Sequence, residues 1–166
     1  TAIFERIVED ITGLSKLQQI SSDKFDIDDA NLNVIINELN QDKPIQYVLG
    51  YEWFGDLKLK VNNDVLIPRP ETLELVNWVH ESIINEKMQE GNLLDIGTGS
   101  GCIAIAISTV LKKWRITAID ISLQALDVSK LNAIEHNQEI TFHQADILNP
   151  KLTFNNTFDI IISNPP

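Results

Sequence analysis

Three glycines at alternate positions, shortly after an acidic residue, are the first feature of the sequence that could do chemistry. Asp95 lies in the apolar run 93–96, and Gly97, Gly99 and Gly101 follow before a second apolar stretch. This order is typical of a strand, a tight loop and a helix start, the unit with which open α/β sheets hold a nucleotide-like ligand. Gly97 and Gly99 can adopt positive φ angles, and without Cβ atoms they let a ligand lie against backbone N–H groups.

The spacing of this loop indicates which ligand it holds. A dinucleotide-binding loop has the pattern G-x-G-x-x-G, whose third glycine would fall where this chain has Cys102. The chain has G-x-G-x-G instead, and the Asp95 carboxylate would repel the phosphates of a dinucleotide. An acid at the strand tip favours a ligand with a cationic end, such as S-adenosylmethionine with its ammonium and sulfonium. A plain strand-to-helix turn is the alternative.

Two further acids follow predicted strands. Asp120 ends the stretch 116–120, where an α/β nucleotide site places an acid that accepts hydrogen bonds from both ribose hydroxyls. Asp146 follows the predicted strand 140–144, where it could accept a hydrogen bond from the adenine amino group while Ile147 packs on the ring. A solvated turn residue is the alternative for Asp146. Three successive strands would then present groups to one crevice.

The sequence Asn-Pro-Pro at 164–166 follows the predicted strand 158–163 and is the second informative motif. The side-chain oxygen of Asn164 can accept two hydrogen bonds, and the two prolines stiffen the turn and aim the Pro165 carbonyl outward. Two neighbouring acceptors suit an –NH₂ group that must be held still while its lone pair is directed at a methyl group. A plain strand-ending turn is the alternative.

Other catalytic arrangements find no support in the sequence. The three histidines, His80, His136 and His143, have no metal-ligand spacing, and we expect no metal site. No Ser/His/Asp or paired-carboxylate pattern indicates hydrolysis. We interpret Cys102, at the start of an apolar helix, as a packing residue.

Composition limits the partners and the size of the fold. The 166 residues can bury one core and a small appendage, and a formal net charge of −11 without a basic block argues against direct binding to nucleic acid. No apolar run is long enough to span a membrane and no signal peptide is visible, so we expect a cytoplasmic protein. The chain begins with Thr1 and stops directly after a strand, and we expect it to be trimmed.

The elements that must position these groups fall into three parts. Residues 1–44 have apolar residues at helical spacing, which predicts a small helical domain that serves as a lid or recognition module, or is purely structural. Residues 45–70 predict a linking β-hairpin, with short strands at 51–54, 57–61 and 65–67. Residues 71–166 alternate strand and helix, which predicts a Rossmann-like parallel sheet.

A stiff segment joins the hairpin to the next predicted helix. Pro68 and Pro70 fix φ on either side of Arg69, and Thr72 comes directly before the helix that begins at residue 73. A charged, extended segment in this place could line a pocket, and we count Arg69 and Thr72 among the substrate-binding candidates. A linker with a solvated arginine is the alternative.

Together these motifs resemble the HemK/PrmC release-factor glutamine methyltransferases, which are class I S-adenosylmethionine-dependent enzymes. Four segments carry the resemblance: Pro-Ile-Gln-Tyr-Val-Leu-Gly at 44–50, Val-Leu-Ile-Pro-Arg-Pro-Glu-Thr at 65–72, Asp-Ile-Gly-Thr-Gly-Ser-Gly at 95–101, and Asn-Pro-Pro at 164–166. The glycine loop belongs to class I methyltransferases generally, Asn-Pro-Pro marks those that act on amino or amide nitrogens, and the proline-rich segment points to this family.

The resemblance implies an activity and roles for individual residues. Such enzymes methylate the side-chain amide of the glutamine in the Gly-Gly-Gln motif of peptide release factors. The cofactor-binding residues would be Asp95, Gly97, Thr98, Gly99, Ser100, Gly101, Asp120, Asp146 and Ile147. Asn164 and Pro165 would be catalytic, and Asn164, Pro165, Pro166, Arg69 and Thr72 would bind the substrate.

Three departures from the family pattern qualify the resemblance. The tyrosine that usually follows Asn-Pro-Pro lies beyond Pro166, Leu73 replaces a frequent acid, and the first helices of the usual N-terminal domain appear absent. The last three strands of the family's sheet would also be missing, which leaves the strand at 158–163 as an open edge. An amino-methyltransferase acting on adenine or cytosine in nucleic acid, and a fragment that binds cofactor or partner without catalysis, remain alternatives.

Overall fold

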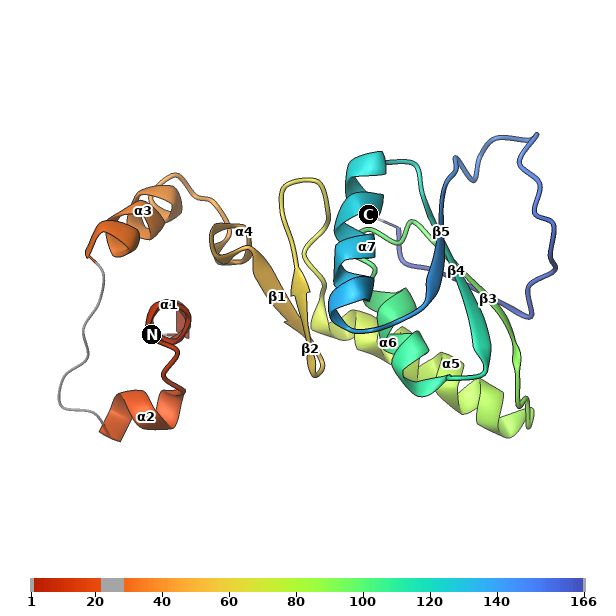
Figure 1. Ribbon diagram of the computed structural model, residues 1–166, viewed down its shortest axis with the longest axis horizontal. Helices are drawn as coiled ribbons and strands as arrows, with labels where there is room; N and C mark the ends of the chain where they lie inside the picture. Colours follow the sequence, from red (N-terminus) through yellow and green to blue (C-terminus); the bar gives the residue numbers. More distant parts are fainter. Residues whose placement is uncertain (1, 22–28, 166) are drawn as a thin grey trace. The chain divides into compact units, whose positions relative to one another are not determined.

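The computed structural model describes residues 2–21 and 29–165. Backbone contacts divide the chain into two compact units, Thr1–Gly50 and Tyr51–Pro166. The first unit is helical and the second contains every strand of the described residues (Figure 1). All of the described candidate site residues lie in the second unit.

The described residues of the first unit, 2–21 and 29–50, form four helices. They are α1 (Ala2–Thr12), α2 (Lys16–Ser21), α3 (Asp29–Leu39) and α4 (Ile45–Leu49). Ile7, Val8 and Ile35 supply buried apolar side chains from α1 and α3, as their helical spacing predicts. Residues 45–49, which we grouped with the hairpin, form a helix instead. Gly50 ends that helix with a φ of 79°, and its amide donates to the Gln46 carbonyl, which is a left-handed C-cap.

The hairpin opens the second unit. Strands β1 (Tyr51–Phe54) and β2 (Leu57–Lys60) pair antiparallel, and the buried Phe54 and Leu59 belong to the main hydrophobic core. The expected third strand at 65–67 is wrong. Val65 is buried, but its amide donates to Asn62 within a turn, and the prolines that follow lack the N–H groups that a paired strand needs.

A four-stranded parallel sheet forms the centre of the second unit. Its strands are β3 (Gly91–Ile96), β4 (Trp114–Asp120), β5 (Ile140–Gln144) and β6 (Ile160–Ser163), in the order β5-β4-β3-β6. The chain runs outward from β3 to β5 and then returns to the other side of β3. The strand order therefore reverses between β3 and β6, and in open α/β sheets ligands bind at the carboxyl ends of the strands beside such a reversal.

The register brings the strand ends to one level. Ile96 of β3 pairs with Ser163 of β6 and with Ile119 of β4, and Asp120 of β4 pairs with Gln144 of β5. Because all four strands are parallel, the residues that follow them emerge at the same edge of the sheet. This edge is where the candidate site residues lie.

Between residues 51 and 165, three helices and a short 3-10 turn complete the second unit (Figure 1). They are η1 (Pro70–Thr72), α5 (Leu73–Asn85), α6 (Cys102–Val110) and α7 (Leu123–Glu135). Residues 103–108 of α6 are all buried, and with the inner face of α5 they pack on the sheet residues Leu93, Ile116 and Ala118. This core fixes the start of α6, and with it the glycine loop. No helix in the described ranges is long and apolar enough to cross a membrane.

Candidate active site

The glycine loop between β3 and α6 adopts the strained backbone that only glycine takes readily. Gly97, Gly99 and Gly101 have φ angles of 72°, 54° and 82°. The amides of Gly97 and Thr98 both donate to the Ile119 carbonyl, at 2.9 and 3.0 Å, and Gly101 donates to Thr98 at 2.8 Å. The loop is therefore held to the end of β4 by its own backbone.

The surface of this loop fits a ligand that is not a phosphate. A Cβ added at Gly97 or Gly99 would meet no atom within 4 Å, so open space lies beside both residues. The Gly99 amide donates to Asp120 Oδ2 at 2.9 Å, so this amide and those of Gly97, Thr98 and Gly101 all point at protein acceptors. We expected a ligand to lie against these N–H groups, but the loop offers it bare backbone beside carboxylates.

Asp95 is buried below the loop. Its side chain is 1% exposed, and Thr98 Oγ1 donates to its Oδ2 at 2.7 Å. Its other oxygen, Oδ1, is buried without a hydrogen-bond partner among the described residues. Burial raises the pKa of Asp95 from 3.8 to about 6, the Thr98 hydroxyl opposes that shift, and the negative charge of Asp120 adds to it. A cationic ligand near these two carboxylates would relieve their repulsion.

Asp120 connects the loop to the start of α7. Its Oδ2 accepts from Gly99, and its Oδ1 accepts from the Ser122 amide at 3.0 Å. Ser122 in turn caps α7 by accepting from the Ala125 amide. A carboxylate can accept about four hydrogen bonds, so Asp120 keeps the capacity to accept from two ligand hydroxyls.

Asp146 and Ile147 follow the edge strand β5. Both are exposed, Asp146 Oδ1 accepts from the Leu148 amide at 2.9 Å, and the backbone just before them is tied to β4 because Ala145 donates to the Asp120 carbonyl. The two residues therefore follow the strand next to the one that ends in Asp120. They lie at the same edge of the sheet as the glycine loop.

Asn164 lies at this edge on the other side of β3. It follows Ser163, which pairs with Ile96 and also donates through Oγ to the Ile96 carbonyl at 2.9 Å. Asn164 Nδ2 donates to Thr72 Oγ1 at 2.9 Å, and its Oδ1 accepts no hydrogen bond from the described residues. Pro165 is exposed, and the candidate Pro166 lies outside the described residues.

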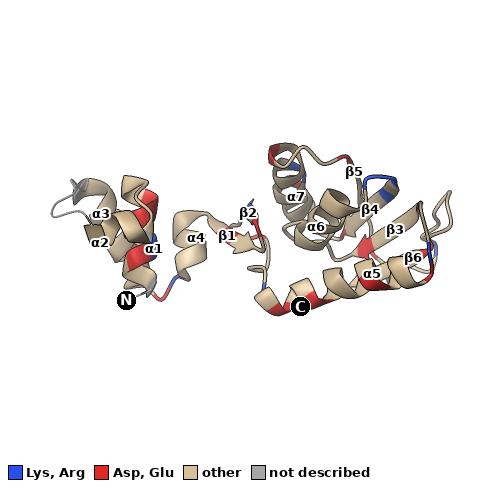
Figure 2. Ribbon diagram, turned by 90° about the horizontal axis from the view of Figure 1, so that it is seen from below, with Lys and Arg blue, Asp and Glu red and all other residues tan. Residues whose placement is uncertain are grey.

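A hollow of about 720 Å³ contains three of the expected substrate-binding residues, Arg69, Thr72 and Asn164. Its other walls come from η1 and α5, with Glu71, Glu74 and Glu81 among the lining residues. Figure 2 shows acidic residues along α5 beside the β6 end of the sheet. The Pro-rich segment and the end of β6, far apart in the sequence, therefore form one concave surface.

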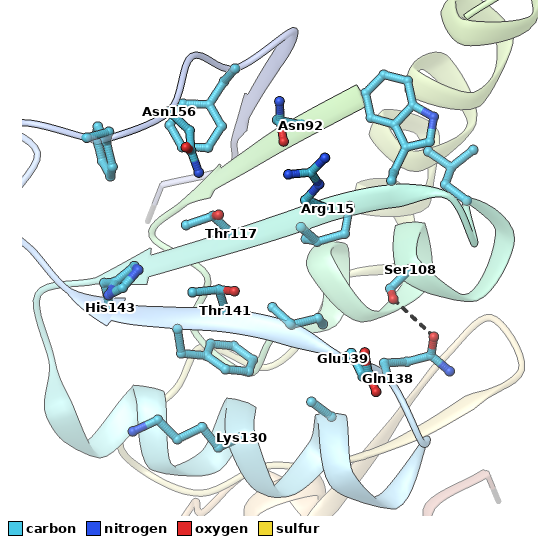
Figure 3. A pocket seen from close by; sticks show the side chains of 18 of the residues that line it. Asn92, Ser108, Arg115, Thr117, Lys130, Gln138, Glu139, Thr141, His143 and Asn156 are labelled. Carbon is cyan, nitrogen blue, oxygen red and sulfur yellow. Dashed lines mark hydrogen bonds between the residues drawn. The ribbon is translucent and has the colours of Figure 1, made fainter. Parts of the chain in front are cut away.

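A larger hollow, of about 1250 Å³, lies elsewhere and contains none of the candidate residues. Figure 3 shows Arg115, Thr117, Thr141 and His143 on β4 and β5, with Ser108 and Gln138 joined by a 3.0 Å hydrogen bond at the other side of this hollow. Its lining residues come from the strands, from α6 and α7, and from residues 152–158. We do not place the chemistry here, because none of the candidate site residues lines this hollow.

Sequence reasoning missed Asn132, which supports the glycine loop from α7. Its side chain is fully buried. Nδ2 donates to the carbonyls of Ser100 and Lys60, at 2.9 and 3.0 Å, and Oδ1 accepts from the Lys60 amide at 2.7 Å. One amide therefore joins the hairpin to the loop. The signal in the sequence was a polar residue at helical spacing from Leu126 and Ser129 on the inner face of α7.

Among the residues that the structure describes, Cys102 does not supply a thiolate, and the acidic side chains do not form a metal site. Burial raises the pKa of the Cys102 thiol to about 12, so the group stays neutral. In the described part of the chain, no group of three or more His, Cys, Asp or Glu side chains could hold a metal ion.

Two curated relatives are similar to the chain over most of its length. The release factor glutamine methyltransferase of Flavobacterium psychrophilum is 39% identical over 169 residues, which covers 99% of this chain and 59% of the relative. The protein of the same name from Lactococcus lactis is 43% identical over 157 residues, which covers 92% of this chain and 56% of the relative. The expected resemblance is confirmed, and the chain spans between half and three fifths of the length of these two relatives.

Solved structures share the fold. The tRNA (uracil-54, C5)-methyltransferase of Pyrococcus abyssi, solved with S-adenosyl-L-homocysteine, matches with a TM-score of 0.54 at 20% identity, covering 70% of this chain and 28% of that one. The N-terminal domain of human METTL16 matches with a TM-score of 0.53 at 26% identity, covering 74% of this chain and 50% of that one. The predicted Rossmann-like methyltransferase fold is confirmed.

A family model matches most of the second unit. The model described as "Methyltransferase small domain" matches residues 79–166, which is more than half of the chain. The matched range begins within α5 and includes the glycine loop, Asp120, Asp146 and Asn164. The chain therefore belongs to the methyltransferase small domain family.

Proposed function

We propose that the protein transfers a methyl group from S-adenosylmethionine to the side-chain amide of the glutamine in the Gly-Gly-Gln motif of peptide chain release factors. The observation that carries the proposal is the pairing of Ile96 with Ser163. It brings the residues after β3, which form the glycine loop, and Asn164 after β6 to neighbouring positions at one edge of the sheet. The names of the relatives, release factor glutamine methyltransferase, support the choice of substrate.

The residues at the sheet edge fit this cofactor. Gly97 and Gly99 leave open space for its methionine portion, and the Asp95 and Asp120 carboxylates favour its positive charges. Asp120 would accept the ribose hydroxyls, and Asp146 and Ile147 would border the adenine. When bound, S-adenosylmethionine supplies an electrophilic methyl group whose bond to sulfur breaks as S-adenosylhomocysteine leaves.

Asn164 and Pro165 would hold the target amide. An amide nitrogen is a weak nucleophile because its lone pair is delocalised into the carbonyl, so orientation in the site must supply much of the rate, worth several kcal/mol. Asn164 Oδ1 and the Pro165 carbonyl would accept the two N–H bonds and stabilise the positive charge that develops on nitrogen. Once the nitrogen is tetrahedral and acidic, its extra proton passes to a water molecule, so no side chain is required as a general base.

The hollow beside Asn164 supports a protein substrate. Arg69 and Thr72 line it with Asn164, and its carboxylates would repel a phosphate backbone. Together with the net charge of −11, this favours a release factor over a nucleic acid. Release factors act in the cytoplasm, where the reaction would take place.

A methylation assay tests the proposal. The intact protein is incubated with labelled S-adenosylmethionine and a release factor, with the same factor carrying Ala for the Gly-Gly-Gln glutamine, and with single-stranded and duplex nucleic acid. Label on the unaltered factor alone is expected. Label on nucleic acid would favour an amino-methyltransferase, and cofactor binding without transfer to any substrate would favour a non-catalytic protein.

Replacement of Asn164 by Ala tests the assigned role. It should lower kcat about 100-fold, as does the loss of one group that stabilises transition-state charge, and should leave the affinity for S-adenosylmethionine nearly unchanged. A variant that loses cofactor binding while its turnover per bound cofactor is unaltered would contradict the assignment.

A further inference from the structure

Thr72 lies directly before α5, yet its side chain does not cap that helix. A threonine in this place ordinarily accepts a hydrogen bond from an amide two or three residues further on. Here no side-chain cap bond is formed. The hydroxyl oxygen accepts instead from Asn164 Nδ2, which lies 92 positions away in sequence. Thr72 is only 6% exposed, whereas Asn164 is an exposed residue, so the contact is partly buried.

The contact matters because the two ends of an asparagine amide do opposite things. Oδ1 can only accept hydrogen bonds and Nδ2 can only donate them, and a half-turn about the last side-chain bond exchanges the two. A substrate –NH₂ group needs an acceptor. With Nδ2 engaged by Thr72, Oδ1 is the end of Asn164 that remains for the substrate. The Thr72 hydroxyl can donate as well as accept, so it holds the place of the Asn164 side chain, while the substrate N–H groups select the oxygen end.

We propose that Thr72 is a positioning residue that holds one end of the Asn164 amide, so that the other end is placed to accept from the substrate. The inference rests on the proposed function, since it needs Asn164 to act as an acceptor. Thr72 would act through Asn164, although we first counted it among the residues that bind substrate directly.

The Pro-rich segment, in the same way, fixes the position of Thr72. Pro68 is buried, Pro70 begins η1, and the Thr72 amide donates to the Arg69 carbonyl at 3.0 Å. Proline fixes φ at both positions, so the path of the backbone up to Thr72 is stiff. This gives the segment a role in the site that does not require Arg69 to touch substrate.

The test compares substitutions at Thr72 in the intact protein, with a release factor as substrate. Thr72→Val keeps the shape and removes the hydroxyl, and Thr72→Ser keeps the hydroxyl. Thr109→Val is the matched control, because the Thr109 hydroxyl donates to the Ala106 carbonyl of its own helix at 2.6 Å. We expect Thr72→Val to lower kcat at least about tenfold with cofactor affinity unchanged, Thr72→Ser to restore most of the rate, and Thr109→Val to leave kcat unchanged.

The double variant Thr72→Val, Asn164→Ala gives the sharpest reading. If Thr72 acts through Asn164, the valine has no further effect once Asn164 is replaced. Additive losses would overturn the inference, and so would a Thr72→Val variant that keeps full kcat or loses cofactor binding together with activity. If the unaltered protein and the release factor give no methylation at all, the proposed function fails instead, and the two failures are distinguishable.

Discussion

Thr98 Oγ1 donates a 2.7 Å hydrogen bond to Asp95 Oδ2, so the second residue of the glycine loop is tied to the acid that ends the buried part of β3. Both side chains are almost completely buried. Asp95 therefore supports the loop from below, and it can influence a ligand through its charge while its Oδ2 is occupied by Thr98.

The raised pKa of Asp95 predicts a pH dependence of stability. Its pKa is about 6 in the folded chain and 3.8 as the ordinary value, so between these values the folded chain holds the proton more tightly. As the pH rises through this window the free energy of unfolding should fall, by about 3 kcal/mol in total. Asp95→Asn cannot titrate and should lack this part of the pH dependence.

Denaturant unfolding of both proteins at about pH 4 and about pH 8 measures the effect. The difference between the two proteins isolates Asp95, because their other acids are the same. Equal pH dependence in the two proteins would mean that folding does not raise the pKa of Asp95.

Asn132 should be essential for the stability of the second unit. Asn132→Ala leaves the buried carbonyl of Ser100 and the partly buried amide of Lys60 without their partners, and an unsatisfied buried group costs about 1–3 kcal/mol. Asn132→Asp should also destabilise, because it places a carboxylate against two carbonyl oxygens. Thermal unfolding measures both, with Asn155→Ala in an exposed loop as the control. A small effect of Asn132→Ala would show that water replaces the side chain.

The alternation of strand and helix predicted most of the second unit, and the reasons are local. The apolar runs at 93–96, 116–120 and 140–144 lie where β3, β4 and β5 form, and the spacing of the glycines predicted the turn that follows β3. The segment 65–67 was misjudged because Val65 is apolar and buried like a strand residue, while its amide donates to Asn62 within a turn.

Contacts across the fold could not be predicted in the same way. The bond between Thr72 and Asn164 depends on β6 returning to the side of β3, which no local pattern specifies. The orientation of the Asp95 side chain could not be predicted either. The residue type is the same whether the carboxylate at the strand tip faces a ligand or Thr98.

Asp120 should control cofactor affinity. Its carboxylate accepts from Gly99 and Ser122 and so holds both the loop and the start of α7. Asp120→Ala should weaken S-adenosylmethionine binding about 10- to 100-fold, because hydrogen bonds to a charged group contribute about 1.5–3 kcal/mol. Calorimetric titration measures this, with Asp127→Ala as the control, since Asp127 is an exposed residue of α7 paired with Lys130. Equal affinities in both variants would contradict the ribose-binding role.

Alanine substitutions at Gly97 and Gly13 distinguish the effect of backbone strain from the effect of losing the ligand site. Both have positive φ, 72° and 69°, and at both an added Cβ would meet no atom within 4 Å. Gly97→Ala and Gly13→Ala should therefore each lower stability by about 1–2 kcal/mol, the cost of a left-handed L-residue. Only Gly97→Ala should also weaken S-adenosylmethionine binding, because its methyl group would fill space beside the loop that we assign to the cofactor. Unfolding and calorimetric titration of the two variants check both effects, and unchanged affinity in Gly97→Ala would mean that the ligand does not lie over this part of the loop.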